Sequence, residues 1–264
     1  MRIVLLGSNG MLGNAIKEEI DCECYGHQAL DITDSDKVDE LLHTNPDVII
    51  NCAAYTDVPG CELNYKPVLN TNIIAPTYIS NKCKNTKFIH FSTDYVFDGE
   101  KEIYTEEDTP FPINRYGWGK YLSELGVLMN PNSLVIRISW LFGPKGNSFI
   151  SKILCNFSRG QREFCVVDDQ KGKVTYTKDI AKNITKMFDL SGIYHFANEG
   201  ELTWYDLARE VFRIKNPLAT IIPISTPTGV ICKRPKNSVL DTTKIKKEGI
   251  HPIDHLSALN DFLK

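Results

Sequence analysis

Short apolar runs alternate with amphipathic stretches over the first ninety residues of this chain. The apolar runs predict four strands, at residues 2–6, 22–25, 47–51 and 87–91. The stretches between them predict helices at residues 11–20, 34–43 and 65–84, and in the second of these Val38, Leu41 and Leu42 have the i, i+3, i+4 spacing of one helix face after an Asp34 cap. Alternating strands and helices with short links predict a parallel sheet covered on both faces.

The regular alternation of strands and helices ends in the second half of the chain. A polar loop at 98–114 precedes a helix at 115–130 and a buried strand at 134–138. Later helices are expected at 179–189, at 203–212 behind a capping box of Thr203 and Asp206, and at 254–263, with a proline-bearing loop at 223–238. The pattern predicts an α/β fold with a doubly wound parallel sheet of the Rossmann type. We expect a dinucleotide-binding domain at 1–143 and a smaller C-terminal substrate-binding lobe at 144–264, interleaved with the first domain.

Composition narrows the class of protein. The 264 residues are 42% hydrophobic and 24% charged, with a net charge of -3, which excludes a disordered chain and disfavours a broad basic face for nucleic acid. The longest nearly apolar stretches, 48–55 and 134–142, are far shorter than the roughly 20 residues that span a bilayer. No signal-peptide core precedes Gly7. We therefore expect a cytoplasmic protein with neither nucleic-acid nor membrane partners.

The cysteines and histidines predict no metal site. The eight cysteines are scattered and include no C-x-x-C pair, and we interpret Cys22 and Cys24 as buried thiols on one face of a strand. His251 and His255 have helical spacing, but Pro252 between them argues against a helical ligand pair.

A glycine motif directly follows the first strand. Gly7, Gly10 and Gly13 form a G-x-x-G-x-x-G loop that opens the first helix. Glycine there permits a tight turn, brings backbone amides close to a pyrophosphate, and lets the helix amino end face the negative charge. The loop, Gly7 to Leu12, predicts dinucleotide binding through Gly7, Ser8, Asn9, Gly10, Met11 and Leu12.

The choice between NADPH and NADH depends on the end of the second strand. Asp31 has about the spacing of the acidic residue that binds the ribose of NAD. The strand is expected to end at Tyr25-Gly26, however, which puts His27 at the diagnostic position. With neither a clear carboxylate nor a clear arginine there, the sequence favours NADPH over NADH by a small margin.

The spacing Y-x-x-x-K occurs twice, at Tyr78/Lys82 and at Tyr116/Lys120. The first pair lies in the helix before the fourth strand, away from the edge where doubly wound sheets bind ligands, whereas the second follows that strand's carboxyl end. Residues i and i+4 share a helix face, so Lys120 reaches both the phenol and a bound ribose. We expect its positive charge to lower the pKa of Tyr116 and to make the phenol a proton donor near neutrality.

The fourth strand ends in the run Ser92-Thr93-Asp94-Tyr95-Val96-Phe97. A hydroxyl at this edge can hydrogen-bond a substrate carbonyl beside Tyr116. The alternative role for Thr93 and Asp94 is to cap the loop that follows.

These motifs together resemble the extended short-chain dehydrogenase/reductase superfamily and, within it, the dTDP-4-dehydrorhamnose reductase family. The similarity covers nearly the whole chain and continues through R-I-S-W-L-F-G at 137–143, D-D-Q-K-G at 168–172 and K-R-P-K-N-S-V-L-D at 233–241. The chain departs from the family pattern at residues 58–62, which lack the usual charged segment, and at Val174, which replaces a proline.

The resemblance implies NAD(P)H-dependent reduction of the 4-keto group of a nucleotide-activated 6-deoxy sugar, dTDP-4-dehydro-L-rhamnose, to dTDP-L-rhamnose. Tyr116 would protonate the oxygen, Thr93 would hold it, and Lys120 would tune Tyr116 and bind the nicotinamide ribose. Further cofactor contacts would come from Asp31, Ile32, Cys52, Ala53, Ala54, Tyr55 and Ser92. Substrate contacts would come from Thr93, Asp94, Tyr95, Trp140, Arg234 and Asn237. The resemblance also suggests that the protein forms a homodimer.

Three other functions remain open on the sequence alone. A related epimerase or another nucleotide-sugar reductase would use the same site. A 4,6-dehydratase needs an acid–base carboxylate pair after the threonine, but Tyr95 follows Asp94 here. A non-catalytic regulatory subunit of methionine adenosyltransferase is the third, because such relatives keep much of the cofactor site.

Overall fold

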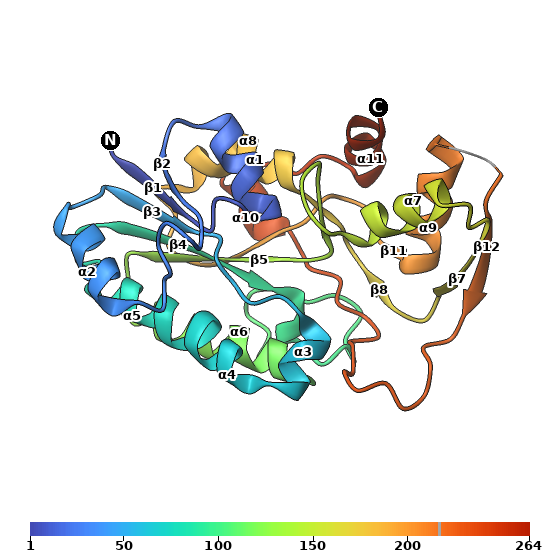
Figure 1. Ribbon diagram of the computed structural model, residues 1–264, viewed down its shortest axis with the longest axis horizontal. Coiled ribbons are helices and arrows are strands. Elements are labelled where there is room, and N and C mark those ends of the chain that lie inside the picture. Colours follow the sequence, from blue (N-terminus) through green and yellow to red (C-terminus); the bar gives the residue numbers. More distant parts are fainter. Residues whose placement is uncertain (216–217) are drawn as a thin grey trace.

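A computed structural model describes residues 1–215 and 218–264, and its centre is a six-stranded sheet (Figure 1). The strand order is β10-β5-β4-β3-β1-β2, and every neighbouring pair is parallel. The strands are β1 (Ile3–Leu6), β2 (Glu23–Tyr25), β3 (Val48–Asn51), β4 (Lys87–Thr93), β5 (Ser133–Ile138) and β10 (Gly192–Phe196). The predicted doubly wound α/β fold is confirmed, and the order in which successive strands are added reverses between β1 and β3.

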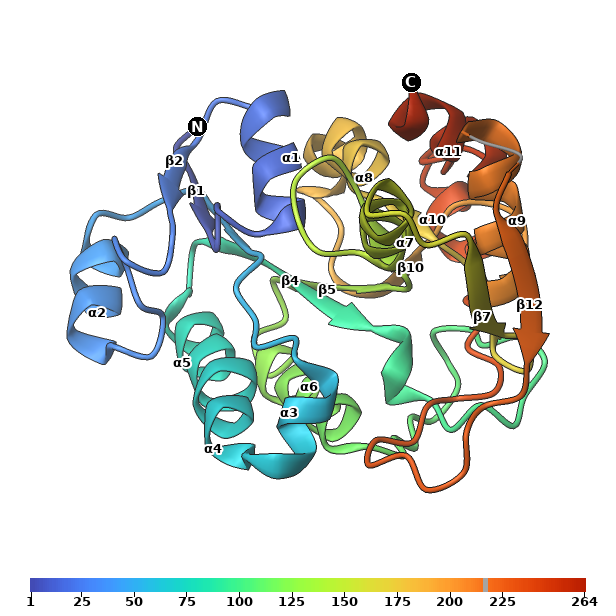
Figure 2. The ribbon, with the colours of Figure 1, turned by 45° about the vertical axis from the view of Figure 1, so that its right-hand side comes forward.

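Helices cover both faces of this sheet (Figure 2). One face carries α1 (Met11–Glu19), α8 (Thr177–Asn183) and α10 (Thr243–Lys247). The other carries α2 (Ser35–His43), α3 (Val58–Leu63), α4 (Tyr65–Pro67), α5 (Ala75–Lys82) and α6 (Arg115–Val127), with a π-helical segment, Val68–Ile74, between α4 and α5. The predicted Asp34 cap is present, since its carboxylate accepts from the Lys37 amide at 3.3 Å. Val38 and Leu41 are buried under α2 as predicted.

The strands are apolar because both of their faces are buried. Leu5 and Ile50 point into the core beneath α1 and α8, whereas Val4 and Ile49 point into the core beneath α2 and α5. Side chains buried on both faces remove apolar surface from water on each side of the sheet, which stabilises it and explains the uninterrupted apolar runs.

The remaining segments of the second half of the chain form a smaller lobe beyond the carboxyl edge of the sheet. Its helices are α7 (Phe149–Ser158), α9 (Trp204–Lys215) and α11 (His255–Leu263). Its short strands pair as β6 (Leu141–Phe142) with β9 (Thr175–Tyr176), β7 (Glu163–Val167) with β12 (Thr220–Ile224), and β8 (Lys171–Gly172) with β11 (Leu202–Thr203). The capping box is confirmed, because the Thr203 amide donates to Asp206 and the Asp206 amide donates to Thr203 Oγ1, both at 3.1 Å.

Two features differ from the sequence prediction. The lobe strands β6, β8, β9 and β11 were not predicted, because each contains two residues and carries no periodicity, and the five-residue strands β7, β10 and β12 were missed as well. The interpretation of Cys24 as a buried thiol is wrong: β2 is the edge strand, and Cys24 is exposed beside a half-buried Cys22, with their sulfurs 3.6 Å apart.

The C-terminal segment at 233–240 crosses back to the sheet after leaving the lobe. The amide of Lys171 donates to the Lys236 carbonyl at 2.7 Å, and the amide of Tyr104 donates to the Val239 carbonyl at 2.8 Å. This segment therefore ties the lobe to the loop that precedes α6.

Within residues 1–215 and 218–264, no helix is long and apolar enough to cross a membrane.

Candidate functional site

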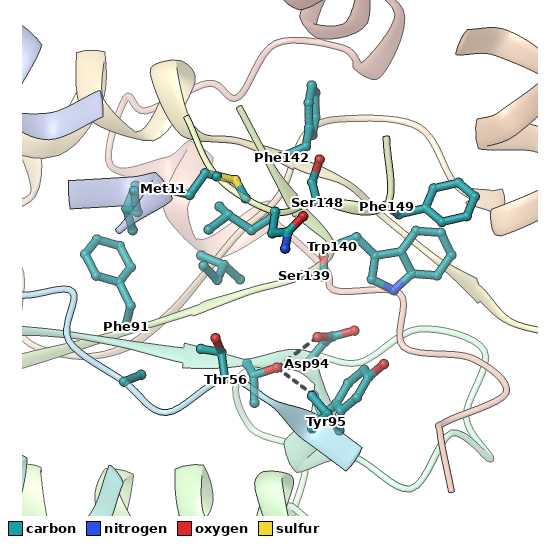
Figure 3. Close-up of a pocket in the computed structure, with 18 of the residues that line it drawn as sticks. Met11, Thr56, Phe91, Asp94, Tyr95, Ser139, Trp140, Phe142, Ser148 and Phe149 are labelled. Atoms are coloured by element: carbon teal, nitrogen blue, oxygen red, sulfur yellow. Dashed lines mark hydrogen bonds between the residues drawn. The ribbon is translucent and has the colours of Figure 1, made fainter. Parts of the chain in front are cut away.

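A cavity of about 880 Å³ opens between the carboxyl edge of the sheet and the lobe. Residues after β1, β3, β4 and β5 line one side of it, and residues of α7, β7 and α9 line the other. Figure 3 shows Asp94 and Tyr95 across this space from Met11, Phe142 and Ser148. In doubly wound folds the carboxyl edge is where ligands bind, so the cavity is the candidate active site.

The glycines of the loop allow neighbouring backbone segments to pack closely against it. Gly7 has φ +72°, and a Cβ there would lie 2.5 Å from the Ala53 amide nitrogen; a Cβ at Gly13 would lie 2.4 Å from the Gly7 carbonyl. Gly10 caps α1 without a side-chain hydrogen bond, so the first-turn amides keep their hydrogen-bonding capacity next to the cavity. Such amides and the helix dipole fit the pyrophosphate of a dinucleotide.

A buried hydroxyl gives a second indication of a ligand. Among the described residues, Ser92 Oγ is a buried side-chain oxygen without a hydrogen-bond partner, and Ser92 lines the cavity. A buried polar group left unpaired costs free energy, and a ligand is one way to pair it. Cys52, Ala53 and Ala54 after β3 line the same part of the cavity with small side chains. These residues fit a nicotinamide dinucleotide.

Helix α6 carries Tyr116 and Lys120 to the cavity beside Thr93. Asn114 caps this helix by accepting from the Gly117 amide at 2.7 Å. A Cβ at Gly117 would lie 2.1 Å from the Tyr95 carbonyl oxygen, so glycine permits the helix to pack directly against the end of β4. Tyr116, Lys120 and Thr93 all line the cavity, and the Tyr116 phenol lies close to the Thr93 hydroxyl.

The predicted lowering of the Tyr116 pKa is wrong. Burial raises the pKa of Tyr116 above its ordinary value, and the negative charge of Asp94 adds to this, while hydrogen bonding with Thr93 opposes it. Burial also lowers the pKa of Lys120 to about 8, against the opposing effect of Glu124. Desolvation therefore sets the direction of both pKa shifts. The phenol stays protonated at neutral pH, which is the form that a proton donor needs.

Asp94 is a buried carboxyl group at the same edge. Ser238 Oγ donates to its Oδ2 at 2.5 Å, and Thr93 Oγ1 donates to its Oδ1 at 3.1 Å. Burial raises the pKa of Asp94 to about 7 in spite of these hydrogen bonds. The Tyr95 amide donates to Thr93 Oγ1 at 3.2 Å, so the hydroxyl is held on two sides (Figure 3).

Trp140 forms part of the cavity wall in an unusual backbone conformation. Its φ is +44°, in the left-handed region that side-chain-bearing residues rarely adopt. Its indole stacks on Trp204 at the start of α9, with ring centroids 3.7 Å apart and planes inclined by 8°. Strain of this kind persists only where the surroundings hold the residue, and it concentrates at ligand sites.

The cavity brings together most of the predicted site residues. Those that line it are Asn9, Gly10, Met11, Leu12, Cys52, Ala53, Ala54, Ser92, Thr93, Asp94, Tyr95, Tyr116, Lys120, Trp140 and Arg234. Those outside its lining are Gly7, Ser8, Asp31, Ile32, Tyr55 and Asn237. Ile32 is buried in the core beneath α2, and the Asn237 amide donates to the Glu102 carbonyl at 2.8 Å, so their roles as ligand contacts stay predictions.

The cavity also contains residues that the sequence analysis missed. Thr56, Lys152 and Trp204 line it, as do Ser148 and Phe149 at the start of α7. The Ser148 and Ser151 side chains form a capping box, which could have identified the amino end of α7 from sequence. Within the described residues, no three His, Cys, Asp or Glu side chains cluster as metal ligands.

Replacing Asp94 by Asn is expected to change how stability depends on pH. Since the folded pKa of Asp94 is about 7 and its ordinary value is 3.8, the folded chain binds more protons between these values, and stability falls as pH rises through them. The variant lacks this loss. Its unfolding free energy relative to wild type should therefore rise by a few kcal/mol between pH 4 and 8, at about 1.4 kcal/mol per pKa unit, in urea titrations. A difference that stays constant with pH would contradict the assignment.

Comparison with known proteins places the chain among sugar-nucleotide enzymes. It is 35% identical to a dTDP-4-dehydrorhamnose reductase of Aggregatibacter actinomycetemcomitans, over 98% of this chain and 97% of that protein. It is 34% identical to a dTDP-4-keto-6-deoxy-D-glucose reductase of Streptomyces niveus, over 96% and 93%. The crystal structure of a dTDP-4-dehydrorhamnose reductase from Bacillus anthracis in complex with NADP superimposes with a TM-score of 0.94 at 32% identity, covering 99% of this chain and 98% of that one.

The family match extends from the first residue to the last. Residues 1–264 match the family described as RmlD substrate binding domain. This agrees with the resemblance seen in the motifs and with the placement of Tyr116, Lys120 and Thr93 at one cavity. The chain belongs to the RmlD family of dTDP-4-dehydrorhamnose reductases.

Proposed function

We propose that this protein is an NADPH-dependent oxidoreductase that reduces the 4-keto group of dTDP-4-dehydro-L-rhamnose to give dTDP-L-rhamnose. The observation that carries the proposal is the convergence of Tyr116, Lys120 and Thr93 on one cavity beside the glycine loop. Relatives named for reduction of dTDP-4-keto-6-deoxy sugars, and the NADP complex of a similar enzyme, support this chemistry.

We assign a catalytic role to each of the three residues. NADPH, when bound, supplies the hydride that reaches C4 of the sugar. Thr93 hydrogen-bonds the keto oxygen, and Tyr116 gives its phenolic proton to that oxygen as the hydride arrives. Lys120 holds its ammonium group on the same helix face, where it stabilises the phenolate that remains. In support of these roles, all three residues line the cavity, and burial keeps the Tyr116 phenol in the protonated form that a donor needs.

We assign the coenzyme and the sugar nucleotide to different parts of the chain. We assign the nicotinamide dinucleotide to residues 1–143 and the sugar nucleotide mainly to residues 144–264. Lys152 on α7 and Arg234 in the segment that crosses back to the sheet both line the cavity and supply two positive charges for a diphosphate. Trp140 supplies an apolar wall for the sugar, while Asp94 and Tyr95 contact it from the sheet side.

Replacing Tyr116 by Phe should lower turnover on the order of 10²-fold or more, because the hydroxyl that donates the proton is removed and the ring is kept. The measurement is NADPH oxidation, followed by absorbance, with dTDP-4-dehydro-L-rhamnose. Tyr78→Phe is a matched control, since Tyr78 and Lys82 form the other Y-x-x-x-K pair and bind Asp39 away from the cavity.

Three outcomes of this assay decide between the functions. Equal rates for wild type and Tyr116→Phe would reject Tyr116 as the acid. Failure of wild type to oxidise NADPH with any 4-keto sugar nucleotide would favour the regulatory subunit. Faster reduction of a different 4-keto-6-deoxy sugar would reassign the substrate and keep the chemistry.

NADPH should have the lower KM when the two coenzymes are compared. Asp31 lies beyond the end of β2 at Tyr25 and outside the cavity lining, and its Oδ1 accepts from the Thr33 amide at 2.9 Å and from the Thr33 hydroxyl at 2.8 Å. A carboxylate in this place is poorly positioned for the ribose hydroxyls that distinguish NADH, which are usually bound by an acidic residue at the strand end. Steady-state titration with each coenzyme measures the preference, and a tenfold preference for NADH would overturn it.

We propose a homodimer as the oligomeric state. Trp118, Leu122 and Leu125 lie on one face of α6 with 40%, 39% and 50% of their surfaces exposed. An exposed apolar stripe of this kind is typical of an interface. Light scattering behind a sizing column should give twice the chain mass, and Leu122→Lys should give the monomer. A monomeric wild type at micromolar concentration would reject the dimer.

We also propose the cytoplasm as its location. All eight cysteines are free, although Cys22 and Cys24 are close enough to react. Free thiols in this number are typical of a reducing compartment.

A further inference from the structure

Behind Lys120 lies a row of buried polar side chains that the mechanism above does not use. His90 on β4 is 1% exposed, Asn51 on β3 is 1% exposed, and Ser123 on α6 is fully buried. The His90 ring is within hydrogen-bonding distance of all three neighbours: Asn51 Nδ2 at 3.1 Å, Ser123 Oγ at 3.1 Å and Lys120 Nζ at 3.0 Å. Burying polar groups costs free energy unless they are hydrogen-bonded to one another, so a buried polar row of this kind suggests a functional role.

The Asn51 amide has its orientation fixed by the backbone. Its Oδ1 accepts from the Ala53 amide at 3.1 Å, which turns Nδ2 toward His90 Nδ1. An amide nitrogen only donates, so Nδ1 must accept and carries no proton. Burial and the nearby Lys120 hold the pKa of His90 well below its ordinary value, so the ring is neutral. The single ring proton is therefore on Nε2.

The protonated Nε2 faces both Ser123 and Lys120. Ser123 Oγ donates its own proton to the Lys120 carbonyl at 2.7 Å and can accept from Nε2. The side chain of Lys120 thus packs against a ring edge that presents an N–H. An N–H opposes a neighbouring ammonium group and suits a neutral amine, which can accept from it. The charged or titratable groups that act on Lys120 from other directions are Cys52 after β3 and Glu124 on α6.

We propose that His90 is a positioning residue for the reaction: it holds the Lys120 side chain against the cavity and eases release of its proton, with Asn51 fixing the ring tautomer. This inference rests on the proposed function, in which Tyr116 gives up a proton in each turnover. The phenolate must regain one, and a lysine one helical turn away that releases its proton easily is suited to supply it. The amine of Lys120 then takes up one proton (H⁺) from the bulk solvent, which is the proton that the net reduction consumes along with the hydride of NADPH.

His90→Gln and His90→Phe separate the two parts of this role. A glutamine oxygen would accept a hydrogen bond from the Lys120 ammonium group. Lys120 would then hold its proton more tightly. We expect kcat at pH 7 to fall about tenfold and the basic limb of kcat/KM to move up by about one pH unit. Phenylalanine removes the partner altogether, so NADPH affinity and kcat should fall together, and Gln should restore the affinity.

His195→Gln is the matched control for these variants. His195 on β10 is as buried as His90 and pairs with Arg137 and the Asp241 carbonyl, outside the cavity lining. Its replacement tests the cost of losing a buried histidine as such. A His90→Gln pH profile that matches wild type, or an equal shift in His195→Gln, would overturn the proposal.

A measurement on the wild type covers the case in which the variants do not fold. Long-range proton–nitrogen NMR distinguishes the two ring nitrogens of each of the six histidines. At pH 7 we expect His90, assigned through bonds, to have a protonated Nε2 and an unprotonated Nδ1. A proton on Nδ1 would refute the inference. Neither the NMR spectrum nor the NADPH-binding measurement needs a sugar substrate. Both can therefore be measured even if the enzyme fails to reduce the proposed sugar, and the two failures can be told apart.

Discussion

The site depends on the direct packing of α6 against the carboxyl end of β4. Gly117 brings the helix backbone up to the Tyr95 carbonyl, and the Asn114 cap fixes where the helix begins. Further along, the Glu124 carboxylate pairs with Arg137 on β5 at 2.7 Å, with both side chains 1% exposed. A buried ion pair that loses one partner leaves an uncompensated charge, so this pair strongly disfavours any shift of the helix along the sheet. Tyr116 and Lys120 are placed between these two anchors.

Desolvation gives this packing its chemical effect. The same burial that keeps the Tyr116 phenol protonated reduces the proton affinity of Lys120, because each group is more costly in its charged form away from water. Asp94 follows the same rule and is held partly protonated near neutral pH. The edge of the sheet therefore holds three titratable groups, none of which has its ordinary affinity for protons.

Much of the fold and most of the residues that line the candidate site could be predicted from sequence. Apolar runs bounded by caps identified the first five strands, and the glycine loop identified the cofactor edge. Position along the chain, and not the spacing alone, distinguished Tyr116 from Tyr78. The short strands of the lobe could not be predicted, because a two-residue strand has no pattern of its own and is formed by its neighbours.

The pKa shifts and the side-chain contacts of the site could not be predicted from sequence, because they depend on how separate segments pack together. The direction of the Tyr116 pKa shift depends on how fully the phenol is buried, which is a property of the packed lobe. The contact of His90 with Lys120 joins side chains thirty positions apart, and neither residue is marked by a motif that includes the other. The stacking of Trp140 on Trp204 likewise joins two separate segments.

The hydrogen bond between Ser238 and Asp94 has a consequence for how such a protein can change over time. It links the last part of the chain to the reactive edge of the sheet across 144 positions, and the Asn114 amide makes a similar link to the Lys233 carbonyl. A recombination event that exchanged the C-terminal part for that of a distant homologue would therefore also replace a partner of Asp94. New sugar specificities should arise in this architecture by point changes within an intact chain, and not by shuffling of prefabricated modules.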